Sequence, residues 1–181
     1  MRILIALLLL PLASAPAQTL RSSGAQRGVL MGAAVDTASI ANDATFAATV
    51  QQQYNMIEAD NEMKWAVIEP TEGVFNFAPG DTLAGFAQAH GMQLRGHNLC
   101  WNSYNPGWLA KGNFTPSQLY TLLETYITTV AGHFKGKVFA WDVVNEALAN
   151  NSNGLRDSIW YNRPGIGLTG PGYIDQTPCT T

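Results

Sequence analysis

Residues 138–146 read Val-Phe-Ala-Trp-Asp-Val-Val-Asn-Glu, an apolar run that ends at two polar residues, Asn145 and Glu146. β-Branched and aromatic residues dominate this run, which is typical of a strand over 138–144. The stretch before it opens at Thr115-Pro116-Ser117, with proline in the first turn, and its apolar residues recur close to the helical period. These residues therefore predict a helix followed by a strand that carries polar groups at its carboxyl end.

The same order of elements repeats through the preceding part of the chain. The pattern predicts strands over 29–35, 54–59 and 92–99 and helices over 40–53 and 81–90. Asp81 is placed to cap the second of these helices, and Gly91 is placed to close it. Strands that alternate with helices imply an α/β fold with a parallel sheet and right-handed crossovers. Chemistry in such folds gathers at the carboxyl ends of the strands.

Polar residues occur where three of the expected strands end. They are Asp60, Asn61, Glu62 and Lys64 after the second strand, His97, Trp101 and Asn102 around the end of the third, and Asn145 and Glu146 after the fourth. The sequence contains no Gly-x-Gly-x-x-Gly, no Walker-type loop and no His/Cys cluster with metal-ligand spacing. Nucleotide cofactors and metal ions are therefore not expected.

Glu146 has the chemistry of a general acid if its surroundings are apolar. Packed behind Trp141 and Phe139, its carboxyl would be partly desolvated, which raises the pKa toward neutral pH. Asn145 could then donate a hydrogen bond to a substrate hydroxyl. The alternative is that Glu146 only caps a following helix, since acidic residues favour first turns.

The cluster after the second strand suits a polyol ligand. Asp60, Asn61, Glu62 and Lys64 offer donors and acceptors to adjacent hydroxyls, although a solvated helix face with Glu62 and Lys64 outward is the alternative. Aromatic residues flank the polar strand ends, namely Trp65, Trp101, Tyr104, Trp108 and Trp141. Sugar rings rest on aromatic faces, yet aromatic residues are more often part of a core, and His97 can equally be a buried histidine. The combination indicates a carbohydrate ligand.

Length and composition limit the fold and the partners. The chain has 181 residues, of which 46% are hydrophobic and 13% charged, with a formal net charge of −3. An apolar content this high supports a packed domain, and the lack of a Lys/Arg cluster argues against nucleic acid as a partner. A closed eight-stranded barrel needs about 250 residues, more than this chain supplies.

The first 17 residues have the pattern of a secretory signal peptide. Arg2 precedes an apolar run over 3–12 and a small-residue site over 13–17. The run is too short to span a bilayer, so a membrane anchor is not expected, and a buried helix is the alternative. We therefore expect a secreted, extracellular protein, in which glycans can be attached at the sequons that begin at Asn113 and Asn150. Cys100 and Cys179 either pair or remain separate thiols.

Taken together, four separated motifs resemble the family-10 glycoside hydrolases, chiefly endo-1,4-β-xylanases, from about Val29 to Ile174. The first two motifs are Asn61-Glu62-Met63-Lys64-Trp65 with Glu69-Pro70, and Gly73-x-Phe75-Asn76-Phe77. The others are Arg95-Gly96-His97-x-Leu99-x-Trp101 with Pro106 and Trp108, and Trp141-Asp142-Val143-Val144-Asn145-Glu146-Ala147. Their order and spacing match the family, and on this basis we take 18–174 as the N-terminal part of its catalytic domain and 175–181 as an atypical tail.

The resemblance implies a TIM (β/α)8 barrel, here truncated to about the first four βα units, that cleaves β-1,4-xylan with retention and needs no cofactor. It implies that Glu146 is the acid/base and that Asn145 holds the 2-hydroxyl of the sugar. Lys64, His97 and Trp101 match residues lining the subsite of the cleaved xylose, and Asn61 matches a binding Asn one sugar further out. Asp60, which precedes it, is expected to bind substrate as well. Xylan or xylo-oligosaccharides are the implied substrates.

Some positions depart from the family pattern. The family usually has Glu where this chain has Asp60, and many members have Val, His and Gln at Cys100, Asn102 and Tyr104. The family nucleophile lies in an Ile-Thr-Glu-Leu-Asp stretch on the seventh strand, and no such stretch follows Glu146 here. The chain alone is therefore expected to be inactive, and the alternatives are a non-catalytic xylo-oligosaccharide-binding fragment or an unstable truncated product with open sheet edges.

Overall fold

Four strands and seven helices alternate along residues 18–150 and 154–161, which are the residues that the computed structural model describes. The strands are β1 (Gly32–Val35), β2 (Met56–Ala59), β3 (Gln93–Trp101) and β4 (Ala140–Asn145). The helices are α1 (Leu20–Ala25), α2 (Thr37–Asn42), α3 (Ala44–Gln53), α4 (Trp65–Ile68), α5 (Ala78–Ala89), α6 (Gly107–Lys111) and α7 (Pro116–His133). None of these helices combines the length and the apolar character that crossing a membrane requires.

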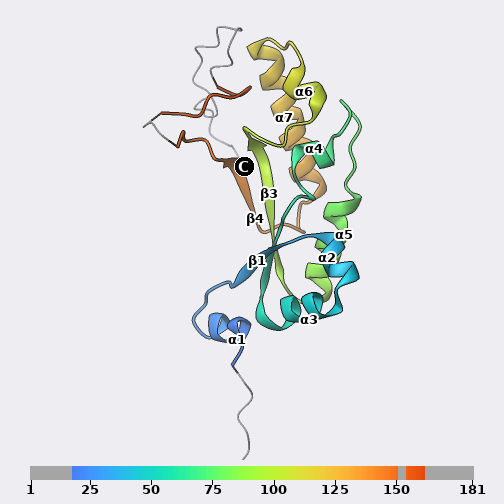
Figure 1. The fold of residues 1–181 in the computed structure, drawn as a ribbon, viewed down its shortest axis with the longest axis vertical. Helices are drawn as coiled ribbons and strands as arrows, with labels where there is room; N and C mark the ends of the chain where they lie inside the picture. Colours follow the sequence, from blue (N-terminus) through green and yellow to red (C-terminus); the bar gives the residue numbers. More distant parts are fainter. Residues whose placement is uncertain (1–17, 151–153, 162–181) are drawn as a thin grey trace, which may run out of the picture.

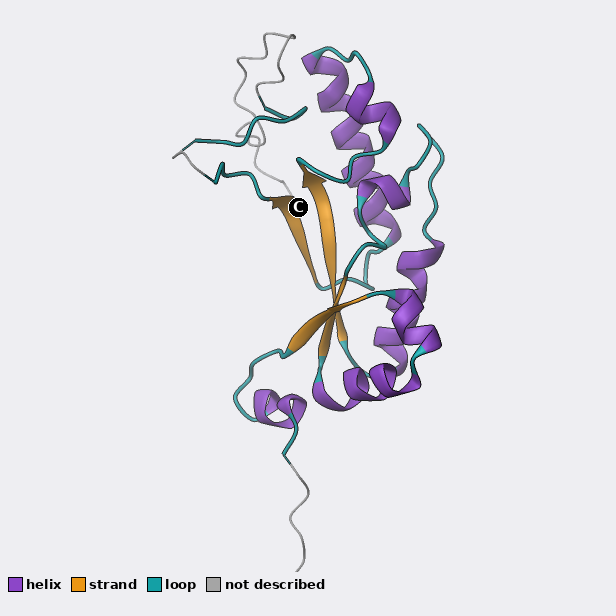
Figure 2. Ribbon diagram, viewed as in Figure 1, coloured by secondary structure: helices purple, strands orange, loops and turns teal. Residues whose placement is uncertain are grey.

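The strands form one parallel sheet in the order β1-β2-β3-β4. Each strand therefore pairs with the next one along the chain, and α2 to α7 lie along one side of the sheet, while α1 lies below the start of β1 (Figure 1, Figure 2). A doubly wound sheet would instead reverse its strand order and place helices on both faces. The parallel α/β prediction is confirmed, and the arrangement is that of a sector of a (β/α) barrel.

The hydrophobic core lies between the sheet and this helical layer. Ile57 of β2 and Leu94 of β3 are almost completely buried, as are Leu83 of α5 and Val130 of α7. Residues alternate along a strand between the two faces of the sheet, so the side chains next to these core residues point to the opposite, helix-free face of the described sheet. The core thus decides which residues are presented on that face.

Local capping chemistry decides where α7 begins. The Thr115 hydroxyl accepts a hydrogen bond from the Gln118 main-chain N–H, and the Gln118 side chain accepts one from the Thr115 main-chain N–H. This reciprocal capping box and Pro116 at the first helical turn confirm the predicted helix start.

Asp81 is not the N-cap of α5, contrary to the sequence prediction. The helix begins three residues earlier, at Ala78, with proline in its first turn. The Asp81 carboxylate instead lies 2.9 Å from His133 Nε2 and 2.7 Å from Lys137 Nζ. Burial raises the pKa of Asp81, but the hydrogen bonds from Lys137 and His133 outweigh it and hold this pKa below its ordinary value. Gly91, at φ +59°, closes the helix as predicted.

Other element bounds also differ from the expectation. The stretch 40–53, expected as one helix, is divided into α2 and α3 because Asp43 accepts a hydrogen bond from Phe46 N and starts a new helix. Strand β1 begins at Gly32 and β2 at Met56, later than predicted, whereas β3 extends to Trp101. Strand β4 spans Ala140–Asn145 rather than 138–144.

Arg21 of α1 fastens the N-terminal segment to the ends of two helices. Its Nη1 donates to the carbonyls of Gln51 and Tyr54, at 3.2 and 3.1 Å, and its Nη2 to those of His90 and Gly91, both at 3.0 Å. These carbonyls lie at the C-terminal ends of α3 and α5, where a helix leaves carbonyls without helical partners and favours positive charge.

Strands β3 and β4 approach closely where Gly96 pairs with Trp141. A Cβ atom on Gly96 would lie 2.3 Å from Cε3 of the Trp141 indole, so only glycine leaves room for this ring. The Trp141 ring also packs against Phe134, at 6.0 Å between centroids, which connects β4 to the end of α7.

Candidate active site

The carboxyl ends of β2, β3 and β4 bring the predicted polar residues to one edge of the sheet. Trp101, the last residue of β3, pairs in register with Asn145, the last residue of β4. Asn61 lies just beyond the end of β2. In Figure 1 the ends of β3 and β4 lie side by side, next to the loops that follow them. This edge is where a parallel α/β fold places its binding groups.

Lys64 is held at this edge by one amide and two aromatic rings. Its Nζ donates to Asn61 Oδ1 at 2.8 Å and lies 4.3 Å from the ring centroid of Tyr104 and 5.2 Å from that of Trp101. Only 7% of Lys64 is exposed. A buried cation needs such partners, because aromatic faces and carbonyl oxygens replace part of its hydration shell.

Glu146 contacts the same aromatic pair through Trp101. The indole Nε1 of Trp101 donates to Glu146 Oε2 at 3.1 Å, and the Trp101 ring stacks on Tyr104 with centroids 5.5 Å apart. Contacts thus run without a break from Asn61 through Lys64 and Trp101 to Glu146. A carboxyl group, a cation and an exposed aromatic face therefore lie within reach of a single ligand.

The predicted desolvation of Glu146 is wrong, because the residue is exposed. Trp141 does not cover it, since the Trp141 ring packs against Phe134 on the helical side of the sheet, and Phe139 is itself 47% exposed. The helix-capping alternative is not supported either, because none of the described residues that follow Glu146 is helical. The nearest polar partner that the structure gives its carboxylate is the Trp101 indole.

The two carboxylates beside Asn61 have different environments. Asp60 is exposed and accepts a hydrogen bond from Asn61 Nδ2 at 2.9 Å. Glu62 is 6% exposed, and its oxygens accept from Thr37 N at 2.6 Å and Asn61 N at 3.0 Å. The alternative of a solvated face, with Glu62 and Lys64 outward, is therefore wrong. Glu62 connects the loops after β1 and β2, while Asp60 stays accessible to a ligand.

His97 belongs to a charged network on the helix-free face of the described sheet. Its Nδ1 lies 3.0 Å from Asp142 Oδ2, and its Nε2 lies 3.3 Å from Asn98 Nδ2. Because a carboxylate only accepts, Nδ1 carries the proton and Nε2 accepts from the amide. The His97 ring also meets the Trp101 ring edge-on, with centroids 5.9 Å apart, so this network supports the aromatic surface.

Arg95 pairs with two carboxylates of the same network. Its guanidinium hydrogen-bonds Asp142 through Nε and Nη2, and its Nε lies 3.4 Å from Glu58 Oε2. Burial raises the pKa of Asp142, but the hydrogen bonds from Arg95 and His97 and the charge of Arg95 outweigh it and leave this pKa below its ordinary value. The same hydrogen bond with Asp142 raises the pKa of Arg95.

Glu58, His97 and Asp142 are the group among the described residues whose side chains could surround a metal ion, with possible ligand atoms within 4.8 Å of one another. The donor chemistry does not favour one, because the Arg95 guanidinium already lies between both carboxylates and supplies the positive charge. The network therefore acts as an ion-pair cluster that orients His97.

Two further tryptophans near the strand ends have structural contacts. Buried Glu69 accepts from Trp65 Nε1 and Gly73 N, both at 2.8 Å, and its carbonyl accepts from Trp108 Nε1 at 3.1 Å. Trp65 also stacks on buried Tyr126, with centroids 3.8 Å apart. Trp65 and Trp108 therefore belong to the scaffold, and Trp101 and Tyr104 form the accessible aromatic surface.

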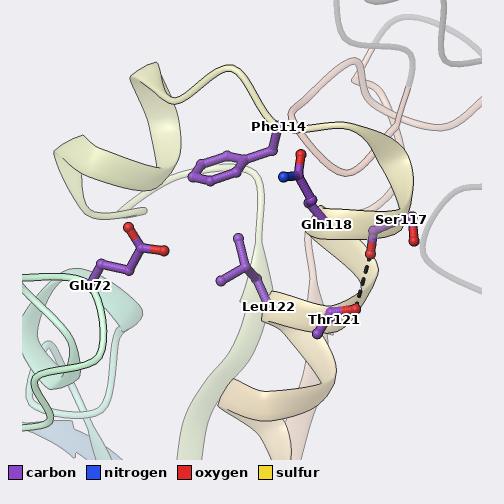
Figure 3. A pocket seen from close by; sticks show the side chains of 6 residues that line it. All are labelled: Glu72, Phe114, Ser117, Gln118, Thr121 and Leu122. Atoms are coloured by element: carbon purple, nitrogen blue, oxygen red, sulfur yellow. Dashed lines mark hydrogen bonds between the residues drawn. The ribbon is translucent and has the colours of Figure 1, made fainter.

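A separate cavity of about 270 Å³ lies in the helical layer, away from the strand ends. In Figure 3 the Phe114 ring and the first turns of α7 face Glu72 across it. Its lining residues are Glu72, Phe114, Ser117, Gln118, Thr121 and Leu122. None of the predicted site residues contributes to this cavity.

The sequence profile of glycosyl hydrolase family 10 matches residues 19–177. The chain belongs to this family. It is 36% identical over 157 residues to an endo-1,4-β-xylanase C of Phanerodontia chrysosporium, an alignment that covers 86% of this chain and 38% of that protein. The chain thus spans well under half the length of this relative.

Solved structures of family-10 members agree with the fold. A glycosylated endo-β-1,4-xylanase of Gloeophyllum trabeum superimposes with a TM-score of 0.74 at 39% identity, covering 83% of this chain and 47% of that one. Xylanase 10B of Thermotoga petrophila RKU-1, solved in complex with xylobiose, gives a TM-score of 0.76 at 32% identity and covers 82% and 46% of the two chains.

For a family-10 chain, the structure brings most of the predicted site residues together. Asp60, Asn61, Lys64, Trp101 and Glu146 are connected by direct contacts, and His97 reaches them through the Trp101 ring. Asn145 lies beside Trp101 in the β3–β4 register, half-buried.

Sequence reasoning missed several residues that contact the site. They are Glu58, Asp142, Arg156 and Trp160. Glu58 and Asp142 could have been found from the alternation of side chains along a strand, which places both on the same face of the sheet as His97 once the register is known. Trp160, whose Nε1 donates to the Trp101 carbonyl at 2.9 Å, had no local signal.

The remaining predictions concern the two cysteines, the two glycosylation sequons and the two ends of the chain. Cys100 is buried, and burial raises its pKa to about 12, but Cys179 lies outside the described residues, so a pairing stays a prediction. Asn113 and Asn150 are both exposed, as a glycan acceptor must be. The predicted signal peptide 1–17 and the tail 175–181 lie outside the described residues.

Proposed function

We propose that this chain carries the acid/base half of a retaining endo-1,4-β-xylanase active site, with Glu146 as the proton donor. The observation that carries the proposal is the connected set of contacts from Asn61 through Lys64 and Trp101 to the Glu146 carboxylate. Family membership and xylanase relatives support the reaction class. The substrate is xylan or a xylo-oligosaccharide.

The proposed binding step uses polar groups beside aromatic faces. A xylose ring rests on the stacked Trp101–Tyr104 pair, whose rings are nearly parallel, with 4° between their planes. Lys64 donates to its hydroxyls, His97 Nε2 accepts from one of them in place of the Asn98 amide, and Asn145 holds the 2-hydroxyl near the bond to be cleaved. Asp60 and Asn61 bind the next sugar. Because Lys64 is already held by Asn61 and two rings, little side-chain entropy is lost when it binds.

The proposed chemical step is a double displacement. Glu146 protonates the leaving oxygen while a second carboxylate attacks the anomeric carbon from the opposite face, and water then hydrolyses the glycosyl-enzyme with Glu146 as base. Retaining enzymes hold these carboxyl groups about 5–5.5 Å apart. The chain spans 43–47% of the solved xylanases it matches, and we expect the attacking carboxylate to come from the remaining part of that fold.

A chimeric barrel tests the role of Glu146 with a second carboxylate present. Residues 19–161 of this chain replace the matching part of the Gloeophyllum trabeum xylanase, and hydrolysis of xylan is compared with that of a dinitrophenyl β-xylobioside. Glu146→Ala should reduce xylan hydrolysis by about 10²–10⁴-fold. It should spare formation of the glycosyl-enzyme from the aryl substrate, whose leaving group needs little protonation. The proposal fails if both substrates are affected equally.

The matched control is Glu72→Ala, which removes an exposed carboxylate from the separate cavity in the helical layer. It should leave both activities unchanged. Proton NMR of the first product distinguishes retention from inversion, and an initial α-anomer would contradict the double displacement. The 181-residue chain alone should bind xylo-oligosaccharides by calorimetry but release no reducing sugar from xylan above a Glu146→Gln variant.

We also propose that the protein is secreted, with residues 1–17 removed, and that Asn113 and Asn150 accept glycans. The charged residue, apolar run and small-residue site support the signal peptide. Expression in a secreting host, followed by N-terminal sequencing and glycopeptide mass spectrometry, tests these points. Recovery of the protein only inside the cells, or of an unprocessed secreted protein, would contradict the proposal.

A further inference from the structure

The backbone of Glu146 lies in the left-handed region. Its φ is +52°, at the residue that directly follows the end of β4. This backbone conformation is unfavourable for a residue with a Cβ atom, which keeps it only where surrounding contacts hold it. Among the described non-glycine residues, Tyr104 of the same site is the other one with a positive φ. The contacts that hold Glu146 in this conformation therefore matter to the site.

Arg156 supplies these contacts from ten residues further along the chain. Its Nε donates to the Glu146 carbonyl at 3.1 Å, and its Nη2 donates to Asn150 Oδ1 at 2.7 Å. Its main-chain N–H donates to the Ala147 carbonyl at 2.7 Å. Asn102 Nδ2, at 3.3 Å, is a second donor to the Glu146 carbonyl. One guanidinium therefore ties both ends of the turn over 146–150.

The same segment also holds the hydrogen-bond partner of the Glu146 carboxylate. Trp160, four residues after Arg156, donates from Nε1 to the Trp101 carbonyl at 2.9 Å. Trp101 in turn donates from its indole to Glu146 Oε2 at 3.1 Å. Main-chain pairing between Leu148 and Leu155 closes the loop between these contacts. The segment 154–161 thus contacts both partners of the indole–carboxylate hydrogen bond.

We propose that Arg156 is a positioning residue that fixes the left-handed backbone of Glu146 and thereby aims its carboxylate at Trp101 Nε1 and at the leaving oxygen. The proposal rests on the proposed function of Glu146 and names a residue that acts through it. Arginine suits the task because its planar fork presents Nε and Nη2 to two acceptors at fixed geometry, whereas lysine offers a single point donor.

The test uses the Trp101 indole as a reporter in the 181-residue chain. ¹⁵N NMR resolves the indole N–H groups of the five tryptophans, and the Trp101 resonance is identified by its loss in Trp101→Phe. Glu146→Ala removes the acceptor and should shift this resonance. In an Arg156→Ala background the carboxylate has already moved away, so the further shift caused by Glu146→Ala should fall below half of its original size.

Arg27→Ala is the matched control, because Arg27 is exposed in the turn after α1, away from the strand ends. In that background Glu146→Ala should shift the Trp101 resonance by its full amount. A full shift in the Arg156→Ala background would overturn the proposal. If Arg156→Ala loses its native spectrum, Arg156→Lys decides instead. In the Arg156→Lys background, a Trp101 shift on Glu146→Ala that lies between half and all of its original size supports the proposal that the guanidinium binds two acceptors. A shift of full size overturns the proposal.

This readout needs no turnover, so it separates the two proposals. If Glu146 is not the proton donor, Glu146→Ala leaves xylan hydrolysis by the chimeric barrel unchanged, while the NMR result for Arg156 still stands. If Arg156 does not position Glu146, the loss of xylan hydrolysis in Glu146→Ala remains and the NMR coupling is absent.

Discussion

Replacing Gly96 by alanine tests how β4, which carries Asn145 and leads into Glu146, is held against β3. Gly96 is buried in β3 and pairs with Trp141. An added Cβ would lie 2.3 Å from Trp141 Cε3 and 2.4 Å from Cζ3, whereas ordinary van der Waals contact begins at 3.4 Å. The ring must therefore retreat by about 1 Å, which is large for a close-packed core. That movement disturbs its packing against Phe134, which directly follows α7.

Two opposing contributions, overpacking and backbone entropy, decide how far Gly96→Ala changes the free energy of unfolding. Overpacking of this kind costs about 1–3 kcal/mol, while replacing glycine inside a strand regains about 0.5–1 kcal/mol of backbone entropy. We therefore expect Gly96→Ala to lower the free energy of unfolding by about 1–2 kcal/mol. In a chain of this length each kcal/mol corresponds to a fall of about 2–4 °C in Tm.

Gly85→Ala is the matched control with the opposite sign. Gly85 is exposed in α5, and no atom lies within 4 Å of an added Cβ, so alanine should stabilise the helix by up to about 1 kcal/mol. Urea unfolding followed by far-UV circular dichroism gives both changes, with an unchanged m-value as the check on two-state behaviour. If Gly96→Ala proved neutral or stabilising, the close approach of Trp141 would not limit this position.

Three further predictions concern other contacts. Arg21→Ala should lower the free energy of unfolding by about 2–3 kcal/mol, because four carbonyls lose a charged donor. The control Arg27→Ala should leave the urea midpoint unchanged, and equal effects of the two substitutions would refute the role of Arg21. The lowered pKa of Asp142 stabilises the fold above the unfolded carboxyl pKa of about 3.9, and this stability is lost as the pH falls through the lower folded value. Urea midpoints between about pH 2 and pH 6 should therefore vary less with pH in Asp142→Asn than in the wild type, and an identical pH dependence would contradict this. Cys100, whose pKa burial raises to about 12, should react with a thiol reagent only after unfolding, as peptide mass spectrometry would show, and rapid labelling of the native chain would refute its burial.

Features set by neighbouring residues could be predicted from the sequence. The α7 start follows from Thr115, Pro116 and Gln118, which interact within one helical turn. The alternation of strands and helices follows from local apolar periodicity, and the parallel sheet follows from that alternation. The polar Asn61 and the aromatic Trp101 at strand ends were found because a parallel sheet brings all of its carboxyl ends to one edge.

Features that depend on register or on distant charge could not be predicted. Asp142 and Arg95 are 47 positions apart, and their pairing appears only once β3 and β4 are aligned. Asp81 was expected to cap a helix, but His133 at the end of α7 and Lys137 in the turn after it take its carboxylate instead. The exposure of Glu146 was missed because the strand pattern does not show that Trp141 packs toward the helices.

Burial and donor chemistry separate the carboxylates around the strand ends without reference to any relative. Glu62 and Glu69 are buried, and each accepts two hydrogen bonds from main-chain or indole N–H groups, which a ligand would have to break to engage them. Asp142 is committed to Arg95 and His97. Glu146 is exposed, and the one donor that the described residues give its carboxylate is the Trp101 indole, so its carboxyl group is accessible to a ligand. In the proposed function, a proton donor needs an accessible carboxyl group and a held backbone; the exposure of Glu146 and the Arg156 hydrogen bond to its carbonyl fit both requirements.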